Sequence, residues 1–439
     1  MAKKQNPPKK QGGAGQDGER QHRDDGSGLS RRRLLGVAGA AGAGGLVVGV
    51  AGGAVGASVA SDDAGGSGGA RLTSLGTTAV PFHGARQPGI TTPAQARTVL
   101  VAYDLEPGAD RAKTAALMRR WSDTAARLGK GERPDADGQV ALDAGPSSLT
   151  ATFGFGGSLF DKLGLADRRP EALKPLPSFP DEELDAARSD GDLLVQVCAD
   201  DALVCFHAVR TLQKLARGVA RVRWQMTGFT RSPGATPQPM THRNLMGQVD
   251  GTGNPQLEDA DFDAKVFVGD AGAAGGAAWA RGGSYVVVRR IRMLLDTWDD
   301  LDVPAQEHII GRRKDTGAPV TGGEERTEPD YGKRGADGRL AIAENAHIRV
   351  SAAEFNRGAT MLRRGYSYHD GVLPDGTPDA GLLFIAWQAD PRQAFVPVQQ
   401  KLARGDALSQ FVRHETSGLF VAPPGCPEGR YVGQELLEP

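Results

Sequence analysis

The sequence predicts an α+β protein whose ordered part is built from two similar halves. Two segments resemble each other, LLVQVCADDALVCFHAVRTLQKLARG at 193–218 and LLFIAWQADPRQAFVPVQQKLARG at 382–405. Each begins with an apolar run of strand length, passes an aspartate and continues with apolar residues at helical spacing. A second pair has the same form, because TVLVAYDLEPG from Thr98 and SYVVVRRIRM from Ser284 each precede a helical pattern that contains a tryptophan. These two pairs indicate an internal duplication.

The elements follow one order in both halves, which we place at residues 76–231 and 284–439. Two further strand candidates lie between the paired segments, SLTATFGFG ending at Gly156 and ATMLRRGYSY ending at Tyr368. Each half therefore reads strand, helix, strand, strand, helix, strand, which is the ferredoxin-like arrangement. Two such halves are expected to bury their antiparallel sheets against each other with helices outside, in a dimeric α+β-barrel-like fold.

Two stretches fall outside this repeating pattern. Residues 232–283 connect the halves, consist mostly of turn-forming residues and contain the motif NLMGQVDGTGNP. Residues 313–339 are rich in glycine, glutamate and aspartate, and we expect them to form a surface excursion. Loops of this kind often carry functional residues on a rigid scaffold.

The first 60 residues have the features of an export signal. SRRRLL at 30–35 resembles the twin-arginine motif, and a Gly/Ala-rich apolar stretch follows it. That stretch is long enough to span a bilayer as an anchor, but its glycines keep its hydrophobicity low, and Ser58-Val59-Ala60 suits a signal peptidase. A flexible linker is expected at 61–75. We expect export by the twin-arginine route to the cell envelope, the periplasm or the medium, of a protein already folded around any cofactor.

The net charge of the chain and the spacing of its cysteines and histidines argue against several classes of function. The formal net charge is −1, so the chain has no general attraction for nucleic acid or for anionic membranes. The three cysteines, Cys198, Cys205 and Cys426, fit neither a zinc site nor a disulfide framework. The eight histidines contain no His-x-His or His-x-x-x-His pair, so a zinc site is poorly supported.

Three places in the chain nonetheless offer chemistry. Asp250, among the glycines of MGQVDGTG, either caps a tight turn or acts on a bound group. His347 in AENAHIRV is either structural or a ligand. If LRRGYSY is a strand, Arg363 and Arg364 point to opposite faces, and the inward one needs a negative charge or a ligand. The residues taken singly leave these alternatives open.

Together these fragments resemble the dye-decolorizing peroxidases, and in particular the exported deferrochelatase/peroxidase branch. The resemblance rests first on the GxxDG turn in RNLMGQVDGTGNP, on HIR, and on LRRGYSY. GFGGSLFDKLGL, IIGRRKDTGAP and GLLFIAWQAD occur in compatible order, so the resemblance runs from FHGARQPGITTPAQ to GLFVAPPG, nearly all of the chain after the signal. The family is built from paired ferredoxin-like halves, which agrees with the internal repeat.

The resemblance implies one haem b per chain between the halves, with His347 as the proximal ligand of the iron. It implies that Asp250 and Arg363 are the catalytic residues on the distal side. Further haem-binding residues are implied, namely Gly251, Thr252 and Gly253 through their backbone, Arg363 again, and Arg349 near a propionate. In such a site a carboxylate moves a proton between the two oxygens of peroxide, and an arginine stabilises the charge that builds on the outer oxygen.

The sequence departs from the family pattern at several positions. Gln248 stands inside the GxxDG motif where many relatives carry a bulkier residue, often phenylalanine. Gln410 stands where we expect an acid beside the proximal histidine, and Asp406 is a nearby acid that could replace it. Without an acid partner the histidine would have less imidazolate character, and the iron potential would be higher. The residues 352–354 replace an Asn-Pro-Arg found in some relatives.

The resemblance implies a haem peroxidase that reduces hydrogen peroxide and oxidises a bulky or aromatic donor of unknown identity. Trp387, Tyr366 and Tyr368 are candidates for carrying electrons from large donors at the surface, unless they are core residues. The alternative is an iron-acquisition protein, working with an iron-uptake system, that releases iron from haem or oxidises ferrous iron. A haem-free ferredoxin-like binding module is a third possibility. A homo-oligomer is compatible with each.

Overall fold

The computed structural model describes residues 76–135, 138–236 and 240–438. The predicted export signal at 1–60 and the predicted linker at 61–75 lie outside the described residues. Within the part of the chain that is described, no helix is both long and apolar enough to cross a membrane.

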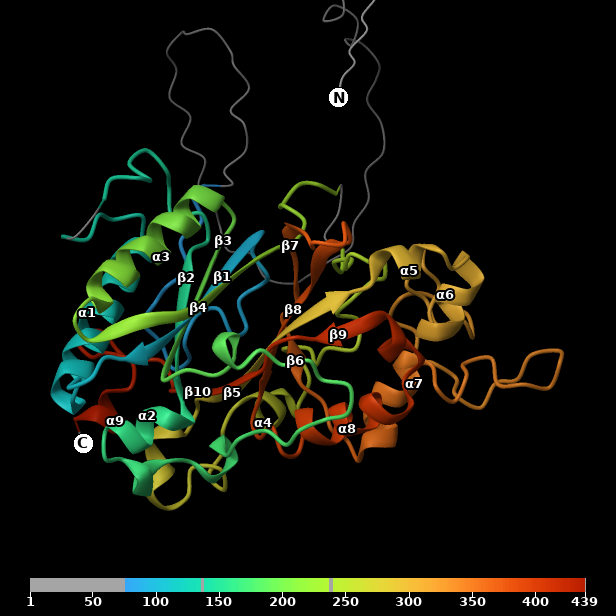
Figure 1. Ribbon diagram of the computed structural model, residues 1–439. Helices are drawn as coiled ribbons and strands as arrows, with labels where there is room; N and C mark the ends of the chain where they lie inside the picture. Colours follow the sequence, from blue (N-terminus) through green and yellow to red (C-terminus); the bar gives the residue numbers. More distant parts are fainter. Residues whose placement is uncertain (1–75, 136–137, 237–239, 439) are drawn as a thin grey trace, which may run out of the picture. The chain divides into compact units, whose positions relative to one another are not determined.

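The first half follows the predicted order of elements (Figure 1). Strand β1 (Arg97–Leu105) leads into helix α1 (Arg111–Gly129), whose first turn is capped by the side chain of Asp110. The remaining elements are β2 (Thr150–Gly156), α2 (Gly157–Lys162), β3 (Leu193–Ala199), α3 (Ala202–Ala216) and β4 (Ala220–Phe229). Helices α1 and α3 lie together on one face of these strands (Figure 1).

The second half also begins with a strand, but its helices are shorter and a short helix follows its last strand. The elements are α4 (Phe262–Val266) in the connection, β5 (Ser284–Met293), α5 (Leu295–Asp299), α6 (Val303–Ile310), α7 (His347–Ser351), β6 (Leu362–Arg363), β7 (Tyr366–Val372), β8 (Pro378–Gln388), α8 (Phe395–Gly405), β9 (Val412–His414), β10 (Gly418–Ala422) and α9 (Gln434–Leu437). The predicted strand ending at Tyr368 is divided into β6 and β7 by Arg364 and Gly365. Both pieces pair with β8 in one continuous register, so the break does not shift the strand.

All strand pairings are antiparallel, and they join the two halves into one sheet. The first half has the strand order β4-β1-β3-β2, and the second has β10-β5-β8-β7, which is the same order when each half is numbered along the chain. The halves meet at two short seams, the single pair Phe229↔Ser367 between β4 and β7 and two pairs between β2 and β10. Because β8 pairs with both β5 and β7, these contacts close the sheet into a ring.

Nearly every residue of β1, β2, β3 and β10 is buried, whereas buried and exposed residues alternate along β4. Along β1, Val99, Val101 and Tyr103 pack in the cluster that includes the helices, whereas Leu100 and Ala102 pack in a second cluster. The second cluster gathers residues of both halves and fills the space between their sheets. This arrangement confirms the prediction of a mixed α+β protein with a large antiparallel sheet.

His414 in β9, whose ring Nδ1 is buried without a hydrogen-bond partner among the described residues, makes the fold sensitive to acid. Burial, assisted by the charge of Arg289, lowers the pKa of His414 to about 3 from the ordinary 6.5. Between these pH values the imidazole of His414 is protonated in the unfolded chain but not in the folded chain. We therefore expect the free energy of unfolding to fall as the pH drops below 6.5. The slope reaches at most about 1.4 kcal/mol per pH unit.

Urea unfolding of the wild type and of His414→Gln at pH 6.5 and 5.5 measures this effect. The interval lies above the range in which most carboxylates titrate. The wild type should lose stability between the two pH values, and His414→Gln should lose less. Equal losses in the two proteins would contradict the assignment to His414.

Candidate active site

Asp250 is carried by a tight turn that its neighbours specify. The backbone N–H of Asn244 donates to Gln248 O at 3.0 Å, and the side-chain Oδ1 of Asn244 accepts from the N–H of Gln248 at 3.3 Å. Asparagine closes turns in this way because its side chain imitates a backbone carbonyl. Gly247 has φ +78°, where glycine is unstrained, and a Cβ on it would lie 2.7 Å from Lys314 Cε. The backbone of the turn therefore favours glycine here, whereas the flexible end of the Lys314 side chain could move aside.

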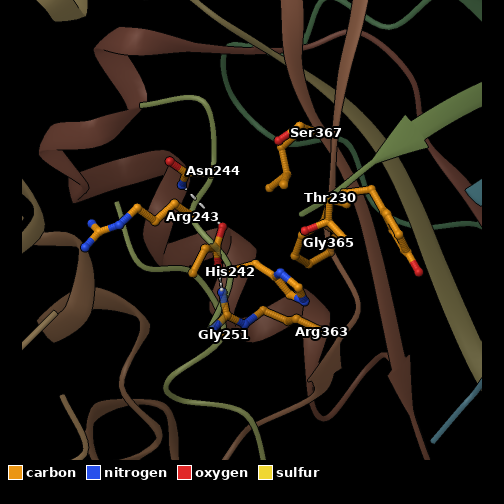
Figure 2. Close-up of a pocket in the computed structure, with 12 residues that line it drawn as sticks. Thr230, His242, Arg243, Asn244, Gly251, Arg363, Gly365 and Ser367 are labelled. Atoms are coloured by element: carbon orange, nitrogen blue, oxygen red, sulfur yellow. Dashed lines mark hydrogen bonds and ion pairs between the residues drawn. The ribbon is translucent and has the colours of Figure 1, made fainter. Parts of the chain in front are cut away.

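The carboxylate of Asp250 is held by one residue on each oxygen. Arg363 Nη1 donates to Oδ1 at 2.8 Å, and Asn244 Nδ2 donates to Oδ2 at 3.3 Å, as the dashed lines to these two residues mark in Figure 2. The backbone N–H of Asp250 donates to His242 O at 2.8 Å. The side chain is 25% exposed, so the carboxylate is fixed but remains accessible from the pocket.

The pocket beneath Asp250 combines polar and apolar walls. Thr230, His242 and Ser367 line it (Figure 2), and so do Leu382 and Phe384 of β8. Burial lowers the pKa of His242, and the positive charges of Arg231 and Arg364 lower it further. Arg243 and Arg363 also line the pocket beside the carboxylate, and Leu382 and Phe384 add apolar surface to it.

The side chains of the adjacent arginines in the LRRGYSY motif point to opposite faces, as expected for a strand. Arg363 faces the pocket and the carboxylate of Asp250. Arg364 is buried on the other side, where its guanidinium donates to the carbonyls of Thr92 and Pro93 and to Gln95 Oε1 of the first half. The structure thus places Arg363 next to Asp250 and uses Arg364 to tie β6 to the first half.

His347 is the first residue of helix α7 and is held by an acid. Its Nδ1 lies 2.6 Å from Asp406 Oδ2, and Asp406 Oδ1 accepts from the N–H of Leu408 at 2.9 Å. Burial lowers the pKa of His347, but the charge and hydrogen bond of Asp406 outweigh it and leave the pKa raised. The charge of Arg363 lowers this pKa further, and the charge of Asp250 raises it.

The acid beside His347 is Asp406, the alternative that the sequence analysis left open. Gln410 is exposed, whereas Asp406 caps the short 3-10 helix Ala407–Phe411 and has a side chain only 4% exposed. An acid at the helix start can cap the helix with one oxygen and still reach His347 with the other. Asp406 therefore takes the position that the sequence analysis left open.

The predicted backbone contacts lie on the same turn as Asp250. Gly251 has φ +131° and lines the pocket, and Gly253 is exposed with open space around its Cα. Thr252 Oγ1 donates to Glu325 Oε1 at 3.0 Å, and Thr241 Oγ1 donates to the same oxygen at 2.6 Å. The role of these residues toward a cofactor stays a prediction.

Arg349 is engaged by the protein itself. Its guanidinium donates to the carbonyls of Tyr331 and, at 3.3 Å, Ile342, and it stacks over the rings of Tyr331 and Phe355. Only one of its terminal nitrogens has no hydrogen bond among the described residues. That nitrogen is available for the predicted contact to a propionate.

Two further expectations can be compared with the structure. Residues 313–339 are not only a surface excursion. Glu325 contacts the turn that carries Asp250, called the distal turn below, and Asp315 O accepts from Arg243 Nη2 at 2.5 Å. Trp387, Tyr366 and Tyr368 are at most 2% exposed, so the alternative that they are core residues is confirmed.

Comparison with known proteins places this arrangement in a family. Residues 87–230 match the family model described as Dyp-type peroxidase, N-terminal, and residues 241–427 match Dyp-type peroxidase, C-terminal. The chain belongs to the Dyp-type peroxidase family. The second match spans the distal turn, His347 and Arg363 in a single region, as the sequence analysis expected.

Similar proteins include both peroxidases and deferrochelatases. A dye-decolorizing peroxidase of Thermobifida fusca (strain YX) is 47% identical over 365 residues, which cover 81% of this chain and 84% of the relative. A deferrochelatase of Escherichia coli (strain K12) is 38% identical over 374 residues, covering 81% of this chain and 87% of the relative. The solved structure of ferric DtpA from Streptomyces lividans is 60% identical with a TM-score of 0.82, and covers 84% of this chain and all of that one (100%).

The donor set of this Dyp-type peroxidase site fits a haem. Asp406 occupies Nδ1 of His347, and Nε2 has no hydrogen-bond partner among the described residues, which leaves it available as a ligand. No group of three His, Cys, Asp or Glu side chains in the described ranges could hold a bare metal ion. His242 Nδ1 and Arg231 Nη1 are buried without partners, as expected where a bound group with anionic substituents completes a site.

Sequence reasoning missed several residues of this Dyp-type peroxidase site. Asn244, Asn254 and Glu325 contact the distal turn or the strand of Arg363, yet none was singled out. Asn244 gives a usable signal, since an asparagine three residues before a glycine is typical of a closed turn. Glu325 lies 73 positions from Thr252 in a polar loop, and no local pattern predicts that contact. Gln248 is buried and is not part of the pocket lining.

Proposed function

We propose that this Dyp-type peroxidase binds one haem b per chain and uses it to reduce hydrogen peroxide while oxidising a bulky or aromatic donor. One observation carries the proposal, namely that the two residue pairs which the family resemblance assigns to the two sides of a haem both form, His347 with Asp406 and Asp250 with Arg363. Haem b is favoured because the cysteines include no Cys-x-x-Cys-His attachment motif. We also infer that the two halves are ferredoxin-like duplicates, since both have the same strand order.

When bound, haem supplies an iron at which peroxide is reduced and from which a donor is later oxidised. On the chain's side, His347 Nε2 is the proposed ligand, and Asp406 holds the ring in the tautomer that leaves Nε2 free. A histidine held by a carboxylate is a stronger base and a better ligand. Gly251, Thr252 and Gly253 are proposed to contact the group through their backbone, and Arg349 through its free terminal nitrogen.

Asp250 and Arg363 divide the work on peroxide. The carboxylate of Asp250 can accept a proton from one peroxide oxygen and return it to the other, so that water can leave. The guanidinium of Arg363 is cationic at all working pH values and stabilises negative charge on the departing oxygen. Leu382 and Phe384 also line the pocket and add apolar surface to it.

Mixing the haem-loaded protein with hydrogen peroxide in a stopped-flow spectrometer tests the function. We expect a rapid change of the Soret band that a phenolic or anthraquinone dye reverses over many turnovers. A spectrum that does not respond to peroxide, or a haem that is only bleached without oxidising a dye, would overturn the proposal.

A second function is suggested by the relatives named deferrochelatase, of which the E. coli protein is 38% identical. In that case haem, or ferrous iron, would be the substrate, and an iron-uptake system would be the partner. Incubation with haem under reducing conditions should then yield the fluorescence of metal-free protoporphyrin. Peroxide turnover without any protoporphyrin would favour the peroxidase alone. Export by the twin-arginine route belongs to both proposals, and so does a possible homo-oligomer.

Asp406 should set the electronic character of the iron site. In Asp406→Asn the ring of His347 loses its charged partner, so we expect a higher midpoint potential and a haem affinity lower by about 10- to 100-fold. Redox titration and haem transfer to apomyoglobin measure the two effects. Gln410→Glu is the matched control, because residue 410 is exposed and should leave both unchanged. A shift in Gln410→Glu and none in Asp406→Asn would contradict the assignment.

A further inference from the structure

Arg363 sits on an open edge of the sheet. Strand β6 contains only Leu362 and Arg363 and pairs with β8 alone. The backbone N–H and C=O of Arg363 turn away from β8, and both are satisfied by one side chain. The N–H of Arg363 donates to Asn254 Oδ1 at 3.2 Å, and Asn254 Nδ2 donates to Arg363 O at 2.7 Å. The carboxamide thus supplies the two hydrogen bonds that a neighbouring strand would supply.

Asn254 is itself fixed to the distal turn. Its backbone N–H donates to Gly251 O at 3.0 Å, and its carbonyl accepts from Gln256 Nε2 at 2.6 Å. Pro255 follows and restricts the backbone of Asn254 to extended conformations. Gly251 is the residue directly after Asp250. A single side chain therefore connects the turn that carries Asp250 to the strand that carries Arg363, 109 positions later in the chain.

We infer that Asn254 is a positioning residue for the peroxide reaction. It acts through Arg363, by holding the backbone from which the guanidinium reaches Asp250, and it is not a residue that touches peroxide. The charged groups of Asp250 and Arg363 come from segments that no continuous strand joins. Their 2.8 Å contact therefore depends on the hydrogen bonds of Asn254 to the backbone of Arg363. The inference rests on the proposed function, because the separation of Asp250 and Arg363 matters to the rate only if both act on peroxide.

A double-mutant cycle on the haem-loaded full chain tests the inference. The proteins are the wild type, Asn254→Ala, Arg363→Leu and the double variant, each mixed with hydrogen peroxide in a stopped-flow spectrometer. Asn254→Ala should slow the reaction by about 10- to 100-fold, the cost of misplacing a reacting group by around 1 Å. In the Arg363→Leu background the same change should alter the rate by no more than about twofold, since its target is gone.

A second readout separates positioning from general damage. Fluoride bound to the ferric protein accepts a hydrogen bond from a distal donor, so its affinity reports where the guanidinium lies. Asn254→Ala should weaken fluoride binding in the wild-type background and leave it unchanged in the Arg363→Leu background. Equal losses of rate or of fluoride affinity in both backgrounds would show a structural role and overturn the inference.

Two further variants keep the test decisive. Gln256→Ala removes a hydrogen bond from the same turn without contacting Arg363, and it should react at nearly the wild-type rate. If Asn254→Ala does not fold, Asn254→Asp replaces it, because the acid keeps the acceptor for the Arg363 N–H and loses the donor to its carbonyl. A wild-type rate in Asn254→Asp would then overturn the inference. A wild-type rate in Arg363→Leu would instead overturn the proposed function, which keeps the two failures distinct.

Discussion

Replacing His347 by alanine is expected to abolish the normal Soret band of the haem-loaded protein. The imidazole of His347 is the only proposed protein ligand of the iron, and Asp406 holds it through Nδ1. We therefore expect no neighbouring side chain to rotate into its place as a new ligand. Removal of this ligand should therefore release the haem or leave it with a strongly shifted spectrum. The absorption spectrum of the purified variant after addition of haem is the measurement.

The matched control for this experiment is His369→Ala. His369 lies in β7, is exposed and makes no contact with the site, so the variant should bind haem as the wild type does. Imidazole added to His347→Ala should restore part of the spectrum if the cavity is the ligand position. An unchanged spectrum in His347→Ala would remove His347 as the ligand.

Replacing Asp250 by asparagine is expected to slow the reaction with peroxide by about 10²- to 10⁴-fold, because an amide cannot carry the proton between the two oxygens. Arg363→Leu removes the cation and should cost about 10²- to 10³-fold. Both variants should keep the haem, since His347 and Asp406 are untouched. The observed rate constant at several peroxide concentrations gives the second-order constant for comparison.

Asp270→Asn and Arg392→Leu serve as controls for these two substitutions. Both residues are exposed surface ion-pair members away from the pocket, and such pairs contribute little to stability. Wild-type reaction rates in both distal variants would show that Asp250 and Arg363 are not the groups that act on peroxide. Loss of haem from either would instead assign it a role in binding.

Several strands were predictable because they contain short apolar runs rich in β-branched residues. Leu193–Ala199 has a single polar residue, and Ser284–Met293 contains three consecutive valines, so their positions needed no knowledge of partners. The opposite orientations of Arg363 and Arg364 followed from the period of a strand alone. Closure of the sheet into a ring was harder to predict from the sequence. One seam consists of the single pair Phe229↔Ser367, which no sequence pattern marks.

The site was predictable where a motif is local and failed where a contact is distant. Asp250 and its glycines form a closed turn within a few residues, so the motif itself specifies the geometry. The acid partner of His347 lies 59 positions away, and a difference of four residues between 406 and 410 changes which side chain points inward. The contact of Glu325 with Thr252 depends on how a long loop folds back, which neither composition nor periodicity records.

The opposite orientations of Arg363 and Arg364 limit how this chain can change in length. One guanidinium faces the pocket and the other is bound to carbonyls near Thr92. Side chains alternate along a strand, so a one-residue insertion or deletion between Arg364 and the turn before β8 would exchange the two faces. Substitutions can alter the pocket gradually. A one-residue deletion here would instead turn Arg363 away from the pocket and Arg364 away from its partners in the first half. Natural variation in this segment should therefore occur in residue type and not in residue number.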